Sequence, residues 1–244
     1  MKYWPFFHHD ITYKPMGCVM DKINIAIDGP AGAGKSTVAK IVASELHYTY
    51  IDTGAMYRAL AWKALHTDTD IEHEASLISL LENTSIEIYP GDEGNKVFVD
   101  TQDVTEEIRS SEVTASVSAV SAHYGVREQM VTTQQRLAMK KGAVLDGRDI
   151  GTVVLPDAEL KIFLIASVEE RAQRRHRENV DNGRPSELQT ILKDIQVRDE
   201  KDMNREISPL VKATDAVEID STRLTIEEVA DKICALARER ISMS

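Results

Sequence analysis

The stretch GPAGAGKST, from Gly29 to Thr37, contains residue types that together bind phosphate. Gly29, Gly34, Lys35 and Ser36 have the spacing G-x-x-x-x-G-K-S, with an apolar run directly before them and a helical pattern directly after. Glycines let the backbone wrap around an anion, so that amide N–H groups and the positive end of the helix dipole point inward. In this context the lysine reaches the β- and γ-phosphates and the serine hydroxyl is a ligand of Mg²⁺. The loop predicts a nucleoside triphosphate site.

The residues expected to bind the triphosphate are Gly29, Pro30, Ala31, Gly32, Ala33, Gly34, Lys35, Ser36 and Thr37. A glycine-rich turn with a stray lysine is the weaker alternative, because the spacing and its surroundings agree.

Two further segments place an arginine just after an expected strand. They are DTGAMYR, which ends at Arg58 and in which we expect Thr53 to cap a helix, and DGRD, which contains Arg148. Either segment alone is also typical of an ordinary cap or turn with a solvated arginine. Taken together in an acidic protein, they favour a second phosphate site, because the planar guanidinium fork suits phosphate better than a point charge does.

A third basic segment, ERAQRRHREN, places Arg171, Arg174 and Arg175 on one helix face by their i, i+3, i+4 spacing. Such a charge run is usually a solvated face. Here the loop NVDNGRP supplies glycine and proline at a plausible hinge. We therefore expect an arginine-bearing lid at about 171–190, which excludes water and places positive charge near the transferring group.

The elements that must position these residues alternate between short apolar strands and longer helices. This order predicts an α/β fold with a five-stranded parallel sheet and helices on both faces. Ligands bind beyond the carboxyl ends of the strands in such sheets, which is where the phosphate-binding segments fall. The expected strands are 23–27, with a possible start at Met20, and 48–52, 143–147, 160–166 and 216–220.

One region breaks this rhythm. Residues 84–104 have short alternating patterns around PGDEGN, which predict an antiparallel hairpin. We expect a small substrate-side insert at about 84–122, beside the main sheet.

Length and composition limit the possible functions. The 244 residues can form one substantial core with a small insert, and the net charge of −11 argues against binding a nucleic acid polymer. Cys18 and Cys234 have no partner at metal-ligand or redox spacing and are interpreted as thiols in a reducing compartment. We expect a cytoplasmic protein with no membrane span, and a monomer by default.

Residues 1–19 contain aromatic side chains but no periodic pattern. Pro5, His8, His9 and Asp10 interrupt any apolar run, which argues against a signal peptide. We interpret this stretch as an extension that the domain at 20–244 does not need; an aromatic docking segment is the alternative.

The segments IDGPAGAGKST, IDTGAMYRALAWKAL, DGRDIGTVVLPDAELKIFL and RDEKDMNR together resemble bacterial cytidylate kinases, of the nucleoside monophosphate kinase group. The resemblance extends from about Met20 to the end of the chain. It implies a P-loop core with an arginine lid, and transfer of the γ-phosphoryl group of ATP, with Mg²⁺, to CMP or dCMP. Another nucleoside monophosphate kinase, with UMP or AMP as acceptor, is the nearest alternative.

The resemblance also implies roles for individual residues. The acceptor phosphate would be held by Arg58, Arg148 and Arg198, in a pocket that Thr53 and Tyr57 line. The cytosine would be read by Ser118, Arg127 and Asp149, and Asp202 and Arg205 would lie near the sugar. The catalytic residues would be Lys35, Arg148, Arg171, Arg174 and Arg175, with Ser36 as the Mg²⁺ ligand.

The chemistry of the bases supports cytosine independently. Cytosine presents an amino donor at N4 and an acceptor at N3, which complement the carboxylate of Asp149 and the guanidinium of Arg127. Uracil reverses both groups, at a cost of roughly 1–3 kcal/mol per mismatched contact. The acceptor phosphate is already anionic, so the reaction needs positioning and charge neutralisation rather than a general base.

Three other classes of protein share the phosphate loop. A regulatory GTPase needs N-K-x-D, and the one candidate, Asn95 to Phe98, lacks the aspartate. A kinase with a hydroxyl acceptor would use Asp52 or Asp146 as a base, but it should not need three arginines for its acceptor. A nucleotide-binding module without activity would lack a second pocket.

Overall fold

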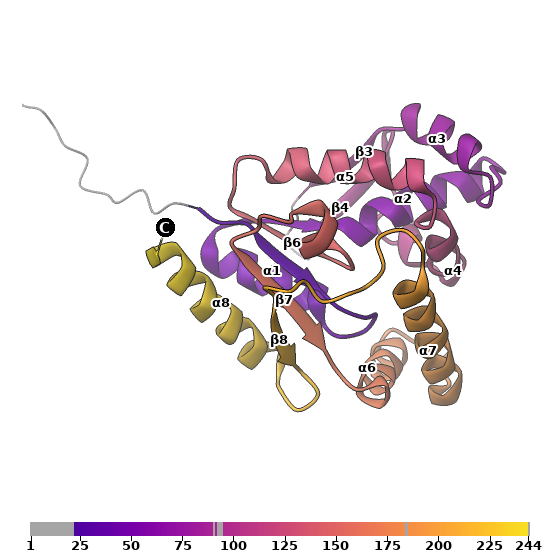
Figure 1. Cartoon of the computed structure of the whole chain (residues 1–244). Coiled ribbons are helices and arrows are strands. Elements are labelled where there is room, and N and C mark those ends of the chain that lie inside the picture. Colours follow the sequence, from indigo (N-terminus) through magenta and orange to yellow (C-terminus); the bar gives the residue numbers. More distant parts are fainter. Residues whose placement is uncertain (1–21, 90, 92–94, 184, 244) are drawn as a thin grey trace, which may run out of the picture.

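A five-stranded parallel sheet forms the centre of the computed structural model, which describes residues 22–89, 91, 95–183 and 185–243 (Figure 1). The strand order is β2-β6-β1-β7-β8, and each neighbouring pair is parallel. The predicted fold class is therefore confirmed. The strands are β1 Ile25–Asp28, β2 Thr49–Asp52, β6 Ala143–Gly147, β7 Leu160–Ile165 and β8 Val217–Asp220.

The first strand is shorter than its sequence pattern predicts. Residues 22–24 are not in a strand, and the predicted start at Met20 lies outside the described residues. Side chains accept from the amides there: the Ile23 amide donates to the hydroxyl of Tyr48 at 3.1 Å and the Asn24 amide donates to Glu159 Oε2 at 2.9 Å.

Successive side chains of β1 point to opposite faces of the sheet, and each face is covered by other elements. Ile25 and Ile27 belong to a core formed with α1 (Lys35–Leu46) and α8 (Ile226–Met243), which cover one face. Ala26 belongs to a second core on the other face, formed with the end of α5 (Tyr124–Ala138) and the π-helical turn η2 (Ile150–Val154). A strand that is apolar on both faces is typical of a covered parallel sheet.

A separate core lies to one side of the sheet. Its buried residues come from α2 (Thr53–His66), α3 (Glu74–Glu82), β4, α4 (Ser111–Val120) and α5. Three antiparallel strands cover it, β3 Ile86–Tyr89, β4 Lys96–Val99 and β5 Gln102–Asp103, joined to α4 through the short helix η1 Glu107–Arg109. The hairpin prediction missed the third strand. The insert limits of 84–122 remain a prediction.

The helices α6 (Val168–Asp181) and α7 (Leu188–Asn204) pack against each other. They lie below α2 and α4 in Figure 1. The predicted lid, 171–190, covers most of α6 and the start of α7, and its residue 184 lies outside the described residues. Its limits remain a prediction.

Several other predictions fall outside the described residues. They concern the extension 1–19, Cys18, and residues 90 and 92–94 of the hairpin turn. Cys234 is described and is a buried free thiol. In the described part of the chain, no helix is both long enough and apolar enough to span a membrane.

Candidate active site

The glycine-rich loop joins β1 to α1 at the carboxyl edge of the sheet, as the sequence predicts. A Cβ atom at Gly29, where φ is +150°, would lie 2.0 Å from the Leu164 carbonyl oxygen of the neighbouring strand, so only glycine fits. Gly34, with φ +90°, is the N-cap of α1. The helix thus begins at Lys35 directly behind the loop, with its unpaired amides and dipole available to an anion.

Lys35 is buried inside this loop, where its Nζ donates to the Pro30 carbonyl at 2.7 Å. Burial, followed by the positive charges of Arg148 and Arg198, lowers the pKa of Lys35 well below its ordinary range, against the opposing effect of Asp146 and Asp28. Burial and the two arginines disfavour the protonated form of Lys35. An anionic ligand next to its amino group would stabilise that form.

Asp146, at the end of β6, connects the loop to β2. Its carboxylate accepts from Ser36 Oγ and from the Tyr50 hydroxyl, each at 2.8 Å. Burial, and then the nearby charge of Asp52, raises the pKa of Asp146. The serine hydroxyl and the carboxylate form a pair of hard oxygen donors beside the phosphate loop, which suits Mg²⁺. The predicted ligand Ser36 therefore has a partner that sequence reasoning considered only as a base.

Thr53 does not cap α2, contrary to the prediction. Asp52 is the N-cap, because its backbone is extended and its Oδ1 accepts from the Ala55 amide at 2.8 Å. Thr53 is the first helical residue, and its Oγ1 donates to the Asp146 carbonyl at 2.7 Å. It thereby joins the start of α2 to the end of β6.

The three arginines expected to hold the acceptor phosphate come from α2, from the turn after β6 and from α7. Arg58 pairs with Asp52 at 2.9 Å, and Arg148 pairs with Asp202 at 2.7 Å. Arg198 has a buried Nε without a hydrogen-bond partner. Burial and then the charge of Arg148, with further repulsion from Arg58, lower the pKa of Arg198 to about 10. The three guanidinium groups therefore lie near one another, and two of them act on Lys35.

The residues expected to read the base form a second, buried group. Asp149 accepts from Arg127 and lies 3.7 Å from the guanidinium of Arg205. Arg127 stacks on Tyr57, 5.6 Å from the ring centre, and burial raises the pKa of Tyr57 to about 12. The Tyr57 hydroxyl and the Arg127 Nε are buried without a partner. These unpaired polar atoms indicate a place for a polar ligand.

Ser118 lies half-buried on α4, and its carbonyl accepts from Ser121 Oγ at 3.3 Å. The carbonyl of Ser121, which the sequence did not single out, accepts from Arg127 at 3.2 Å. Because serines recur along this helix, the sequence alone does not distinguish which of them contacts the base. Asp202 is a buried residue of α7, and its pair with Arg148 links this group to the acceptor arginines.

The predicted lid arginines have three different environments. Arg171 is buried, and its guanidinium donates to the carbonyl of Ala31 at 2.9 Å and pairs with Asp199 at 2.6 Å. Arg174 donates to the Ser221 carbonyl at 2.7 Å and lies near Gly34. Arg175 is more exposed and pairs with Glu178, yet its charge also acts on Arg198. Arg175 is the most exposed of these three arginines, and their membership of a lid remains a prediction.

Sequence reasoning did not select Asp28, Tyr50 or Asp199. Asp28 is a buried carboxylate at the end of an apolar strand, and an acid at that position was the available signal. Tyr50 and Asp199 gave no distinct signal, because their partners lie far away in the chain.

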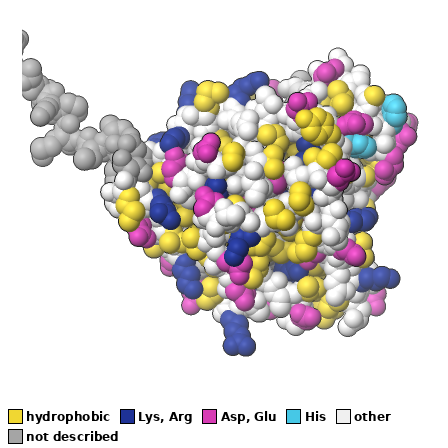
Figure 2. Space-filling view, viewed as in Figure 1, with side chains coloured by type: hydrophobic (Ala, Val, Ile, Leu, Met, Phe, Trp, Pro, Cys, Tyr) yellow, Lys and Arg dark blue, Asp and Glu magenta, His cyan; other side chains and the backbone are white. Residues whose placement is uncertain are grey.

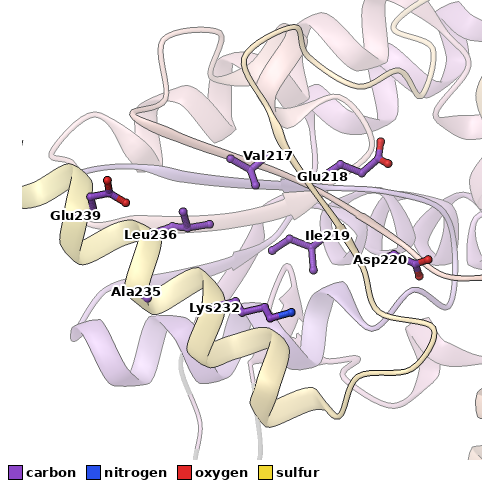
Figure 3. A pocket seen from close by; sticks show the side chains of 8 residues that line it. All are labelled: Val217, Glu218, Ile219, Asp220, Lys232, Ala235, Leu236 and Glu239. Carbon is purple, nitrogen blue, oxygen red and sulfur yellow. The ribbon is translucent and has the colours of Figure 1, made fainter.

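A groove of about 470 Å³ lies elsewhere, between the edge strand β8 and α8 (Figure 3). Val217, Ile219 and Leu236 are among the side chains that line it, and none of the predicted site residues does. The candidate site is therefore the cluster of polar residues and not this groove.

A glycine-rich phosphate loop that faces clustered arginines, at the carboxyl edge of a parallel sheet, defines a P-loop kinase. Residues 25–239 match the family model described as Cytidylate kinase. The chain belongs to the cytidylate kinase family, as its sequence motifs predict.

Individual relatives agree with this assignment. A cytidylate kinase from Geobacillus sp. (strain WCH70) is 59% identical over 221 residues, which cover 91% of this chain and 99% of the relative. A cytidylate kinase from Geobacillus thermodenitrificans (strain NG80-2) is 58% identical over 220 residues, which cover 90% of this chain and 98% of the relative. The crystal structure of an uncharacterized protein from Eubacterium ventriosum ATCC 27560 shares the fold with a TM-score of 0.50 at 14% identity, over 90% of this chain and 99% of that chain.

Proposed function

We propose that the protein transfers the γ-phosphoryl group of ATP to CMP or dCMP, giving ADP and CDP or dCDP. The observation that carries this proposal is the buried Nε of Arg198, which has no hydrogen-bond partner, together with Lys35 buried in the phosphate loop. Buried cations require anions, and two phosphate groups, one on each side, supply them.

We call residues 29–37 with Asp28 and Asp146 the donor side. The acceptor side comprises Arg58, Arg127, Arg148, Asp149, Arg198, Asp202 and Arg205. In the proposed reaction, an oxygen of the acceptor phosphate forms a bond to the γ-phosphorus and the bond from that phosphorus to the β,γ-bridging oxygen breaks. The acceptor oxygen is already anionic, so no side chain has to remove a proton. Lys35 and the arginines stabilise the charge that spreads over the transferring group.

Base selection is proposed to depend on the buried pair Arg127–Asp149. The carboxylate of Asp149 would accept from the N4 amino group of cytosine, and the guanidinium of Arg127 would donate to N3 and O2. Their pairing in the present structure supports this assignment, because each group fixes the other and Asp149 also lies 3.7 Å from the guanidinium of Arg205. A pocket with fixed polar groups discriminates strongly against the base that mismatches them.

Ser36 and Asp146 would hold Mg²⁺ with the phosphates of ATP. Bound there, the ion neutralises phosphate charge and orients the phosphate chain. Asp146→Asn should therefore remove the strengthening of ATP binding by Mg²⁺, measured by calorimetry with and without the ion. Equal strengthening in the variant and the wild-type protein would rule out Asp146 as a metal-side residue.

A coupled assay of ADP formation with MgATP tests the proposed function. The panel contains CMP, dCMP, UMP, AMP and GMP as acceptors. We expect CMP and dCMP to be preferred, with UMP weaker by about one to two powers of ten in kcat/KM. A preference for UMP or AMP would instead support the alternative monophosphate kinase, and no transfer to any acceptor would overturn the proposal.

We also propose a cytoplasmic, monomeric protein without a nucleic acid partner. The face shown in Figure 2 has acidic and basic side chains interspersed rather than one broad basic field. With a net charge of −11, this pattern does not favour a phosphate backbone. Light scattering and a filter-binding assay with DNA and RNA would test the two statements.

A further inference from the structure

Asp28 is a buried carboxylate with no place in the proposed reaction. It ends β1 directly before Gly29, and it is 4% exposed. Its Oδ1 accepts from the Ile150 amide at 2.8 Å and its Oδ2 accepts from the Gly151 amide at 2.7 Å. Both oxygens are therefore used, and both partners are backbone groups of one short turn.

The turn that these two bonds hold follows two acceptor-side residues in the chain. Ile150 and Gly151 are the first residues after Arg148 and Asp149, and η2 begins at Ile150. A single side chain thus joins the start of the triphosphate loop to the segment that carries two acceptor-side residues. The contact is close, because a Cβ atom at Gly151 would lie 3.4 Å from Asp28 Oδ2.

We propose that Asp28 is a positioning residue that fixes Arg148 and Asp149 relative to Lys35 and thereby sets the affinity for the acceptor nucleotide. The inference rests on the proposed function of the acceptor side. Only a carboxylate can accept both amides. An asparagine presents an NH₂ group to one of them and leaves a buried backbone donor unpaired, so the turn should shift.

Charged groups from three other elements surround Asp28. Lys35 of α1 favours the ionised carboxylate, whereas Asp149 in the turn after β6 disfavours it. Lys161 of β7 lies behind Gly151, whose Cβ atom would be 3.1 Å from Lys161 Cδ. Burial is the largest effect and raises the pKa of Asp28 to about 6. A protonated carboxyl group also loses one acceptor, so it should behave like the asparagine.

The test compares CMP binding to wild-type protein and Asp28→Asn by calorimetry between pH 5 and 8, with the fold checked by circular dichroism. At pH 8 we expect Asp28→Asn to raise the Kd for CMP about tenfold and the Kd for ATP less than about twofold. At pH 5 the ratio of the two CMP dissociation constants should shrink to about twofold, because most of the wild-type carboxyl is then protonated. The titration of CMP itself cancels in this ratio. Asp220→Asn, which changes the exposed aspartate at the end of β8, is the matched control and should leave CMP affinity unchanged.

Equal loss of CMP and ATP affinity, no loss of either, or a ratio independent of pH would overturn the positioning role. A wild-type protein that fails to bind CMP would overturn the proposed function and this inference with it. If Asp28→Asn does not fold, the amide proton shifts of Ile150 and Gly151 in the wild-type protein replace it. They should titrate together near pH 6, and saturating CMP should lower their midpoint, because binding that needs the ionised carboxylate favours that form. A midpoint that stays or rises would contradict the inference.

Discussion

The donor side and the acceptor side of the site are built in opposite ways. The donor side is one continuous loop of backbone amides with a single buried lysine. The acceptor side is a set of side chains from α2, α5, α7 and the turn after β6, held by ion pairs such as Arg148–Asp202 and Arg127–Asp149. A backbone site depends on local conformation, whereas a side-chain site depends on the packing of distant elements.

The carboxyl groups of the two sides differ accordingly. On the donor side, burial raises the pKa of Asp28 and of Asp146. On the acceptor side, burial acts on Asp202 in the same direction, but the positive charges of Arg148 and Arg198 outweigh it and lower the pKa of Asp202. The comparison predicts that substitution of Lys35 in the loop affects the chemical step, and that substitutions on the acceptor side affect acceptor binding and choice. Asp28, which joins the two sides, should also affect acceptor binding.

The largest effect is expected for Lys35→Ala. Loss of a charge that stabilises the transferring phosphoryl group should lower kcat by about 10³-fold, while the protein remains folded. Steady-state kinetics and thermal unfolding measure the two properties. Lys40→Ala, in the same helix, is the control and should retain activity. If Lys35→Ala retains a tenth of the wild-type kcat, the role assigned to this lysine is wrong.

The second effect concerns stability and pH. The pKa of Asp28 rises from 3.8 to about 6 on folding, so between these values the folded state binds more protons than the unfolded state. The free energy of unfolding contributed by Asp28 should therefore fall by about 2 kcal/mol as pH rises from 4 to 6. Subtracting the urea-unfolding profile of Asp28→Asn from that of the wild-type protein isolates this slope.

Asp202 provides the comparison of opposite sign. Because its pKa is lowered in the folded state, its contribution is present above its unfolded pKa and is lost as pH falls. A difference profile for Asp28 that rises with pH, like the one expected for Asp202, would contradict the contrast between the two sides.

The third effect is on acceptor affinity. Arg198→Ala should raise the KM for CMP roughly 30-fold and change the KM for ATP less than about twofold, because a charged hydrogen bond to phosphate is lost. Stability should not fall, since burial and neighbouring arginines disfavour this charge in the folded protein. Arg177→Ala removes an exposed arginine of α6 and serves as the control. An equal rise in both KM values would place Arg198 outside the acceptor side.

The smallest effect is on base choice. Asp149→Asn should reduce the preference for CMP over UMP about tenfold in kcat/KM, because the amide can donate where the carboxylate only accepts. Asp157→Asn, at an exposed position after η2, should leave the preference unchanged. An unaltered ratio of CMP to UMP in Asp149→Asn would remove Asp149 from base recognition.

The same difference between the two sides determines how much the sequence could predict. The loop at 29–37 and the five parallel strands follow from local spacing and periodicity. The acceptor side required the resemblance to a family, because nothing local indicates that Arg58, Arg148 and Arg198 come together. Local patterns also misled at Thr53, where Asp52 is the better cap, and at β1, where the amides before Ile25 donate to side chains.

The buried connections were not predictable from spacing. Asp28 meets Ile150 across 122 residues, and Arg171 meets Ala31 across 140. Such contacts depend on the order of strands in the sheet, which brings β1, β6 and β7 together. They also explain why Arg171, expected to belong to a mobile lid, lies buried against the triphosphate loop.

The central claim is that two anion sites face each other closely enough for one phosphoryl group to pass between them. Calorimetric binding of cytidine and adenosine joined 5′ to 5′ through five phosphates tests it most directly, with ATP alone and CMP alone as references. Because the joined nucleotide would occupy both sites at once, it should bind at least about 10²-fold more tightly than ATP alone. Binding no tighter than that of ATP would show that the two sites do not face each other, and would contradict the account.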